Sequence, residues 1–124
     1  MTIAPERLLE LGHAYTAAFD ARDWAAVRKM YADDAVYVSP NPPMVSTDYG
    51  NRIEGADALV AFFDQVTATN DASFEPLEHF VGHDLFTTTW RWGKIVGQDI
   101  IRYGPDELIF EQYDVTPKRT TLHR

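Results

Sequence analysis

The sequence predicts an α+β domain in which helices occupy the first half of the chain and an antiparallel sheet the second half. Near the N-terminus, apolar residues recur at spacings of three and four, the period of an amphipathic helix. After Ser73 the segments are rich in β-branched and aromatic residues, as strands are, and short turns containing glycine separate them. Helices followed by hairpin-connected strands are typical of α+β proteins.

Two helices are expected before residue 35. Pro5 and Glu6 suit the first turn of the first helix. Its apolar stripe comprises Leu8, Gly12, Tyr15 and Phe19. Asp23 can cap a second, short helix, which Asp33-Asp34 would end. The apolar residues of this second helix are Trp24, Val27 and Tyr31.

A strand, a loop and a third helix should follow. Residues 35–38 have the composition of a strand. Residues 40–54 contain three prolines and several polar residues, and a loop of this length in a compact domain is more often functional than accidental. We expect it to act as a lid. The third helix should run from about residue 56 to residue 67 and end at Asn70-Asp71.

Four strands are expected after Ser73, joined by hairpin turns. The strands should cover about residues 74–81, 85–92, 95–103 and 108–116. The turns between them are Gly82-His83-Asp84, Gly93-Lys94 and Gly104-Pro105-Asp106. Together these segments predict an antiparallel meander.

Length and composition indicate one globular domain, residues 1–124. A chain of 124 residues can bury a single core and is too short for two. Aromatic residues make up 13% of the chain, and many of them fall in the predicted strands. This bulk favours a concave sheet that lines a cavity with aromatic side chains.

Charge and residue types argue against several classes of protein. The net charge is −8, and the basic residues gather only in the tail at Lys118, Arg119 and Arg124, too sparsely to hold phosphates. Neither nucleic acid nor membrane is therefore an expected partner. The absence of cysteine excludes disulfides and thiolate chemistry. No two histidines have metal-ligand spacing, and we expect neither a metal nor another cofactor. Without a signal-peptide pattern or a long apolar run, the protein is expected to be cytoplasmic.

Two aspartates on the last two predicted strands are the leading candidates for chemistry. Because alternate residues of a strand share a face, Asp99 should point with Ile101, and Asp114 with Gln112 and Phe110. Burying an ionised carboxylate among apolar neighbours is costly, and the usual outcome is a raised pKa or a specific partner. Two such acids on neighbouring strands predict an active site.

The order of the elements resembles the nuclear transport factor 2-like superfamily. The most specific motifs are residues 30–35, Glu54-Gly55 and residues 99–115. The resemblance covers about residues 7–116, leaves 117–124 as a tail, and is closest to SnoaL-like polyketide cyclases and ketosteroid isomerase. It implies a cone, in which a curved antiparallel sheet wraps around three N-terminal helices and encloses a pocket. It also implies a homodimer.

The resemblance to ketosteroid isomerase suggests roles for particular residues. In that family a tyrosine and a protonated acid stabilise a dienolate oxygen, and they correspond to Tyr15 and Asp99. The family's carboxylate base corresponds to Ser39, which cannot act as a base. A further family tyrosine corresponds to Phe63. Steroid-type isomerisation is therefore not expected.

The resemblance to the SnoaL-like cyclases suggests Asp114 as the acid or base. Their last strand carries a motif resembling Glu-His-Trp-Asp-Val, and this chain has Glu111-Gln112-Tyr113-Asp114-Val115. The aspartate is retained, whereas Gln112 replaces the histidine. Limonene epoxide hydrolase places its water-activating aspartate near this position, but its arginine–aspartate pair has no convincing counterpart here.

A ligand would contact the concave face of the sheet and the third helix. Aromatic residues on alternate positions of one strand could stack on a flat ligand. The histidine that follows the same alternation on the preceding strand could also face the cavity. The expected substrate-binding residues are Phe63, His79, Phe86, Thr88, Trp90, Trp92, Ile101, Phe110 and Gln112.

Each candidate also has an interpretation without function. Asp99 could lie solvated near a strand end, and Asp114 could form an ion pair with Arg91 or Arg102. Tyr15 could be a core residue of its helix. The aromatic face could be ordinary core packing.

The function that these residues predict is a cofactor-independent enzyme for a small, largely apolar carbonyl compound. Asp114 would act as acid or base, while Asp99 and Tyr15 would stabilise negative charge on oxygen. Proton transfer next to the carbonyl would lead to aldol-type cyclisation, isomerisation or dehydration. Two other functions stay open: a ligand-binding domain without turnover, and an association module that uses the outer face of the sheet.

Overall fold

A computed structural model describes residues 2–68 and 73–116 of the chain. The helices are α1 (Pro5–Asp20), α2 (Trp24–Lys29), α3 (Pro42–Val45) and α4 (Ala56–Ala68). The strands are β1 (Tyr31–Val38), β2 (Arg52–Glu54), β3 (Phe74–Gly82), β4 (Leu85–Trp92), β5 (Ile95–Tyr103) and β6 (Ile109–Val115).

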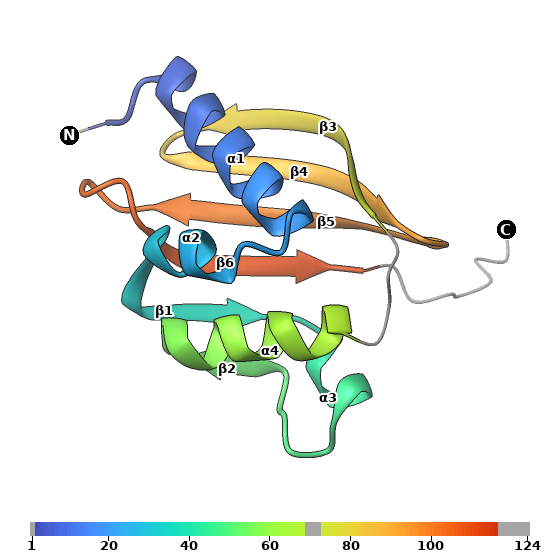
Figure 1. The fold of residues 1–124 in the computed structure, drawn as a ribbon. Coiled ribbons are helices and arrows are strands. Elements are labelled where there is room, and N and C mark those ends of the chain that lie inside the picture. The colour runs from blue at the N-terminus through green and yellow to red at the C-terminus, as the bar shows by residue number, and fades with distance from the viewer. Residues whose placement is uncertain (1, 69–72, 117–124) are drawn as a thin grey trace, which may run out of the picture.

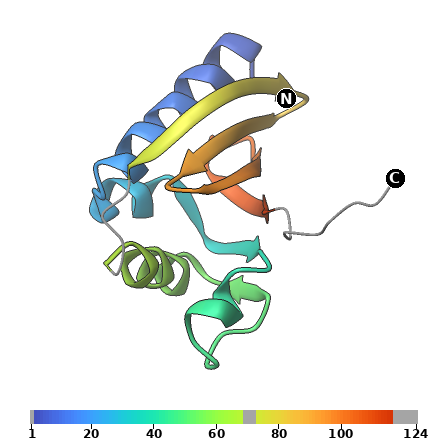
Figure 2. The same cartoon turned by 90° about the vertical axis from the view of Figure 1, so that its right-hand side faces the viewer.

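The six strands form one sheet in the order β2-β1-β6-β5-β4-β3. The sheet is strongly curved, and α1, α2 and α4 lie against its concave side (Figures 1 and 2). This arrangement confirms the predicted α+β cone. In the part of the chain that the structure describes, no helix is long and apolar enough to cross a membrane.

The helices begin where their local sequence predicts. Pro5 occupies the first turn of α1, and the Asp23 carboxylate caps α2 by accepting a hydrogen bond from the Ala26 backbone N–H at 3.2 Å. The apolar stripe of α1 is buried apart from the partly buried Phe19, and α4 buries Phe62 and Phe63, the latter 5.1 Å from the Phe19 ring. Side-chain burial of these stripes fixes the helices on the sheet. The expected helix end at Asn70-Asp71 lies outside the described residues.

The boundary between α2 and β1 differs from the prediction. The helix ends at Lys29, and Tyr31 already belongs to β1, where it pairs with Ile109 of β6. The expectation that Asp33-Asp34 ends the helix is therefore wrong. These two residues lie in an irregularity of the strand between Tyr31 and Val36. Burial of the Tyr31 ring and pairing with β6 outweigh the local helical pattern.

The expected loop at residues 40–54 contains two short elements, α3 and β2. Strand β2 pairs with the end of β1 and makes the edge of the sheet. Tyr49 packs its ring against Phe62 of α4 at a centroid distance of 5.2 Å and donates a hydrogen bond to Gln65 Oε1 at 2.7 Å. The segment is thus attached to α4.

The sheet is mixed, because β1 pairs with β6 in parallel. The prediction of a wholly antiparallel sheet missed this pair, since β1 and β6 are far apart in the sequence. The parallel register places Tyr37 beside Gln112 and Val38 beside Tyr113. It therefore brings the end of β1 close to Asp114, where side chains of this segment donate hydrogen bonds to the Asp114 carboxylate.

The pairing of β5 with β6 is antiparallel and places Asp99 directly opposite Asp114. Beyond Arg102 and Glu111 the register shifts, so that Tyr103 pairs with Ile109. Phe110 is the extra residue of this bulge, and its side chain is exposed on the outer face. The expectation that Phe110 shares a face with Asp114 is wrong because the bulge interrupts the alternation. Phe110 instead lies under the Arg102 guanidinium, at 5.0 Å.

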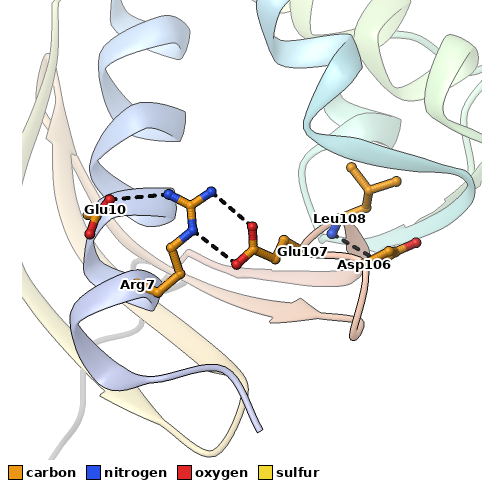
Figure 3. A network of polar contacts seen from close by, with 5 residues as sticks. All are labelled: Arg7, Glu10, Asp106, Glu107 and Leu108. Carbon is orange, nitrogen blue, oxygen red and sulfur yellow. Dashed lines mark hydrogen bonds and ion pairs between the residues drawn. The ribbon is translucent and has the colours of Figure 1, made fainter. Parts of the chain in front are cut away.

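An ion-pair network joins the first turns of α1 to the turn between β5 and β6 (Figure 3). The Arg7 guanidinium donates two hydrogen bonds to the Glu107 carboxylate, at 2.9 and 3.0 Å, and a third to Glu10 at 3.2 Å. The hydrogen bonds and charge of Arg7 lower the pKa of Glu107. Exposed pairs of this kind add little stability, so we interpret the network as one that orients the turn.

Candidate active site

A cavity opens between the concave face of the sheet and helices α1 and α4. Its volume, counted as the space that the centres of water molecules can occupy, is about 70 Å³. This is enough for several waters or a small organic molecule. The polar side chains in its wall are Tyr15, Tyr37, Asn41, Thr67, Asp99, Gln112 and Asp114. The apolar wall consists of Phe19, Phe62, Phe63, Val66, Phe74, Trp90 and Trp92.

Asp99 and Asp114 share this wall as a cross-strand pair, and both are buried, at 8% and 7% exposure. Burial, the negative charge of Asp114 and a hydrogen bond with Asp114 hold the pKa of Asp99 well above its ordinary value. Two adjacent buried carboxyls cannot both ionise easily, and the raised pKa of Asp99 favours the proton on that member of the pair. The idea that Asp99 lies solvated near a strand end is therefore wrong.

Asp114 is held by neutral donors. Its Oδ2 accepts hydrogen bonds from Asn41 Nδ2 at 2.7 Å, Ser39 Oγ at 2.9 Å and the Tyr37 hydroxyl at 3.1 Å. Its Oδ1 lies 3.4 Å from the Thr116 hydroxyl. Because the three strong donors converge on Oδ2, Oδ1 is the oxygen left for Asp99 or a ligand.

The alternative ion pair of Asp114 with a sheet arginine is also wrong. Arg102 lies on the outer face and donates to Glu111 at 2.6 Å. Arg91 lies 3.8 Å from Glu75 on the same outer face. The sheet separates both guanidinium groups from the acid pair, and among the residues that the structure describes the polar part of the cavity wall consists of acids and neutral groups.

Tyr15 is completely buried on α1, and its hydroxyl belongs to a small network. The Tyr31 hydroxyl can donate to Tyr15 at 2.8 Å or to Gln112 Oε1 at 2.5 Å, and Gln112 Nε2 donates to Tyr15 at 3.3 Å. Tyr31 has one hydroxyl proton and can donate to one acceptor at a time. When Tyr31 donates to the Tyr15 oxygen, the Tyr15 hydroxyl can donate its own proton to a ligand. Burial raises the pKa of both phenols, so both stay neutral donors.

The structure brings together some of the expected substrate-binding residues. Phe63, Trp90, Trp92 and Gln112 line the cavity. Other expected residues face the same side of the sheet but lie outside the cavity wall: Phe86, Thr88 and Ile101. These are core residues; Phe86, for example, packs so closely on Gly12 that a Cβ there would lie 2.3 Å from its ring.

His79 also lies outside the cavity wall. It packs edge-on against His13 of α1, with ring centroids 4.8 Å apart, and against Phe86 at 5.3 Å. Burial and the neighbouring His13 lower its pKa. Its environment is the contact between α1 and β3, away from the acid pair.

Four polar residues of the cavity wall and its hydrogen-bond network were not identified from the sequence: Tyr31, Tyr37, Asn41 and Thr67. Tyr31 was assigned to a helix, and the face of Tyr37 depends on the parallel pairing of β1 with β6. Ser39 was considered only as a missing base, whereas the structure makes it a donor to Asp114. The alternation of Tyr37, Ser39 and Asn41 toward one side is the signal that could have found them.

The chemistry available in this cavity is hydrogen bonding and proton transfer. The residues described contain no cluster of three or more histidine or acidic side chains arranged to hold a metal ion. A protonated acid, a second acid and a buried phenol can together bind an oxygen atom and accept a proton from a neighbouring carbon. These features define a class of protein: an α+β cone with an acid pair in an aromatic cavity.

Comparison with known proteins identifies the family. Residues 13–118 match the family model described as a SnoaL-like domain. Since this match covers most of the chain, the protein belongs to the SnoaL-like domain family, as the sequence motifs predict. No curated protein matches the chain in sequence.

Solved structures show the same fold. A SnoaL-like protein of unknown function from Burkholderia thailandensis superposes with a TM-score of 0.82 at 19% identity, over 94% of this chain and 99% of that one. A proposed ketosteroid isomerase from Kribbella flavida gives 0.74 at 18% identity, over 97% and 84%. A proposed SnoaL-like polyketide cyclase from Shewanella denitrificans gives 0.66 at 18% identity, over 89% and 90%. At these identities the similarity establishes the nuclear transport factor 2-like fold and not the reaction.

Proposed function

We propose that this protein is an enzyme that moves a proton on the carbon next to a carbonyl group of a small, largely apolar compound. The observation that carries the proposal is the buried pair Asp99–Asp114, opposite each other on β5 and β6 in the wall of an aromatic cavity. One member of the pair holds a proton and the other can receive one. No metal or other cofactor is needed for this chemistry.

In the proposed reaction, the carbonyl oxygen lies against the Asp99 carboxyl and the Tyr15 hydroxyl. Asp114 Oδ1 takes a proton from the neighbouring carbon, the electron pair of that C–H bond forms a carbon–carbon double bond, and the π pair of the carbonyl moves onto its oxygen to give an enolate. Asp114 becomes neutral as the oxygen becomes negative, so the total charge in the cavity does not change. Donors already placed at the oxygen stabilise this charge without reorganising.

The enolate can then react in three ways. Return of the proton from Asp114 to a different carbon gives isomerisation. Attack of the enolate carbon on a second carbonyl of the same molecule, whose oxygen takes the proton from Asp114, gives aldol-type cyclisation. Loss of the hydroxyl on the next carbon, which takes the proton from Asp114 and leaves as water, gives dehydration. Ser39 stands where the isomerases have their base and donates to Asp114 instead, which favours the cyclisation route.

The direct test is hydrogen–deuterium exchange of a simple ketone. We expect the protein in D₂O to accelerate exchange of the hydrogens next to the carbonyl of cyclohexanone, followed by proton NMR, over buffer at the same pD. The ketone has few atoms and one carbonyl, so it fits a small cavity and tests the first step alone. Binding of cyclohexanone without faster exchange would contradict the proposal.

One observation favours the second candidate function, a ligand-binding domain without turnover. Three hydrogen bonds to Oδ2 hold the Asp114 carboxylate in one orientation, as suits a group that positions a bound molecule. In that case the acid pair would orient a bound molecule. The exchange experiment separates the two functions, because a binding domain would hold the ketone and leave its hydrogens unchanged.

We further propose that two copies associate through the outer face of the sheet. This face carries exposed apolar side chains on three strands, namely Phe80, Val96, Phe110, Tyr113 and Val115. Apolar clusters on a soluble protein commonly mark an interaction site. A second copy offers the same surface and would cover these side chains without a further partner.

Charged substitutions on that face should separate the copies. We expect the double variant Phe80→Asp with Val115→Asp to run as a monomer by light scattering after gel filtration, and the unaltered chain to run as a dimer. The control is Glu6→Lys, on the first turn of α1 and away from this face. A monomeric unaltered chain, or a double variant that stays dimeric, would show that the outer face is not the interface.

A further inference from the structure

We propose that the indole N–H of Trp90 is an additional donor to the substrate oxygen, beside Asp99, and that the cavity therefore binds planar, delocalised oxyanions such as enolates and phenolates. The inference rests on the proposed function, because it concerns the same cavity. It adds a catalytic group and names the electronic character of the ligand.

The first observation is an unsatisfied donor. Trp90 is 6% exposed and lines the cavity. Among the residues that the structure describes, its buried Nε1 has no hydrogen-bond partner. A buried indole N–H usually finds an acceptor, because leaving it unpaired after desolvation is costly. A donor that is buried, unpaired and in the wall of a cavity is suited to a ligand atom.

The second observation explains where this donor lies. Trp90 pairs with Gly97 across β4 and β5, and Asp99 follows two residues later on the same face. A Cβ on Gly97 would lie 2.5 Å from Trp90 Cζ2 and 2.7 Å from Cη2. The indole thus lies directly on the Gly97 backbone. Any larger residue at position 97 would push it away.

The third observation links the indole to the acid pair. The indole N–H of Trp90 lowers the pKa of Asp99. This effect is smaller than the increase caused by burial and by Asp114. The N–H therefore lies near the Asp99 carboxyl, within the described residues, without making a hydrogen bond of ordinary geometry to it. An oxygen atom bound to the protonated Asp99 would lie within reach of this second donor.

The ligand chemistry follows from these positions. An oxyanion has several lone pairs and can accept from Asp99 and Trp90 together, whereas a C–H or alkyl group cannot. The cavity around the donors is aromatic, with Phe74 packed at 5.7 Å from the Trp90 ring, which suits a flat ligand. When a phenol binds, its proton can pass to Asp114 Oδ1, and the phenolate oxygen then accepts from the two donors.

The experiment is an NMR titration of the whole chain with 4-nitrophenol, whose visible absorption reports its ionisation. The chain has three tryptophans, so three indole N–H signals are expected. Trp24→Phe and Trp92→Phe identify two of them and leave that of Trp90. We expect the Trp90 signal to move farthest downfield on binding. We also expect Trp90→Phe to weaken 4-nitrophenol binding about tenfold, the effect of losing one hydrogen bond to a charged group.

Two variants serve as comparisons. Gly97→Ala keeps the indole but displaces it, and should weaken binding to a similar degree. Trp24→Phe removes an indole outside the cavity wall and should leave binding within about twofold. The Trp90 signal of the unaltered chain is decisive even where a variant fails to fold. Binding of 4-nitrophenol with an unmoved Trp90 signal, or with full affinity in Trp90→Phe, would overturn the inference.

The outcome is separable from that of the proposed function. If cyclohexanone exchange is catalysed but 4-nitrophenol does not bind, or binds without involving Trp90, the inference fails and the proposed function stands. If 4-nitrophenol binds through Trp90 and no exchange occurs, the oxyanion site is retained and the proposed reaction fails.

Discussion

Replacing Asp114 by asparagine should reduce the exchange of ketone hydrogens by about 10² to 10⁴-fold, the usual contribution of a general base. An amide cannot take the proton that Asp114 Oδ1 receives. It retains an oxygen that can accept from Ser39, Tyr37 and Asn41, so the fold and the end of β1 should keep their positions. The rate is measured by the same NMR exchange assay under saturating ketone.

A matched control is Asp33→Asn, which makes the same chemical change at an exposed position of the β1 irregularity. Its exchange rate should equal that of the unaltered chain. Asp99→Asn should retain part of the rate, because an amide can still donate to the carbonyl oxygen. If Asp99→Asn loses more than Asp114→Asn, the assigned roles of the two acids are reversed.

The sequence was a good guide to the elements whose signals are local. Helical spacing located α1 and α4, and composition located β4 and β5 at the predicted residues. Strand alternation also placed Asp99 correctly in the interior, because β5 has no irregularity between Asp99 and Ile101.

The failures share one physical cause, pairing and packing between elements that no local sequence pattern specifies. Phe110 was misplaced because a bulge depends on how β6 pairs with β5. Tyr31 was misplaced because its burial against Tyr15 and its pairing with Ile109 are tertiary. The donors to Asp114 were missed for the same reason, since β1 reaches β6 only through a parallel pairing that no local pattern specifies.

Replacing Asp99 by asparagine should stabilise the protein at neutral pH, and this is the second large effect. The pKa of Asp99 is raised in the folded chain by burial, by the charge of Asp114 and by a hydrogen bond with Asp114. In the unfolded chain it returns to the ordinary value of about 3.9. Between these two values the unfolded chain releases a proton that the folded chain keeps, so the free energy of unfolding falls as the pH rises.

The stabilising contribution of Asp99 is therefore complete below about pH 4 and is lost as the pH rises through the raised pKa. Asparagine stays neutral at every pH, so the variant should lose this decrease of the free energy of unfolding with pH. At neutral pH its free energy of unfolding should exceed that of the unaltered chain by more than the roughly 0.5 kcal/mol of an ordinary surface substitution. Urea unfolding of both proteins from pH 4 to pH 8 measures the difference.

Groups away from the acid pair change stability with pH in both proteins equally. The pKa of Glu107 is lowered by Arg7, so Glu107 makes the free energy of unfolding rise with pH. This contribution is the same in both chains and cancels in the difference between them. An identical pH dependence of Asp99→Asn and the unaltered chain would mean that Asp99 is ionised in the fold. The acid pair would then have no proton to offer a carbonyl oxygen, and stabilisation of the enolate would fall to Tyr15 and Trp90 alone.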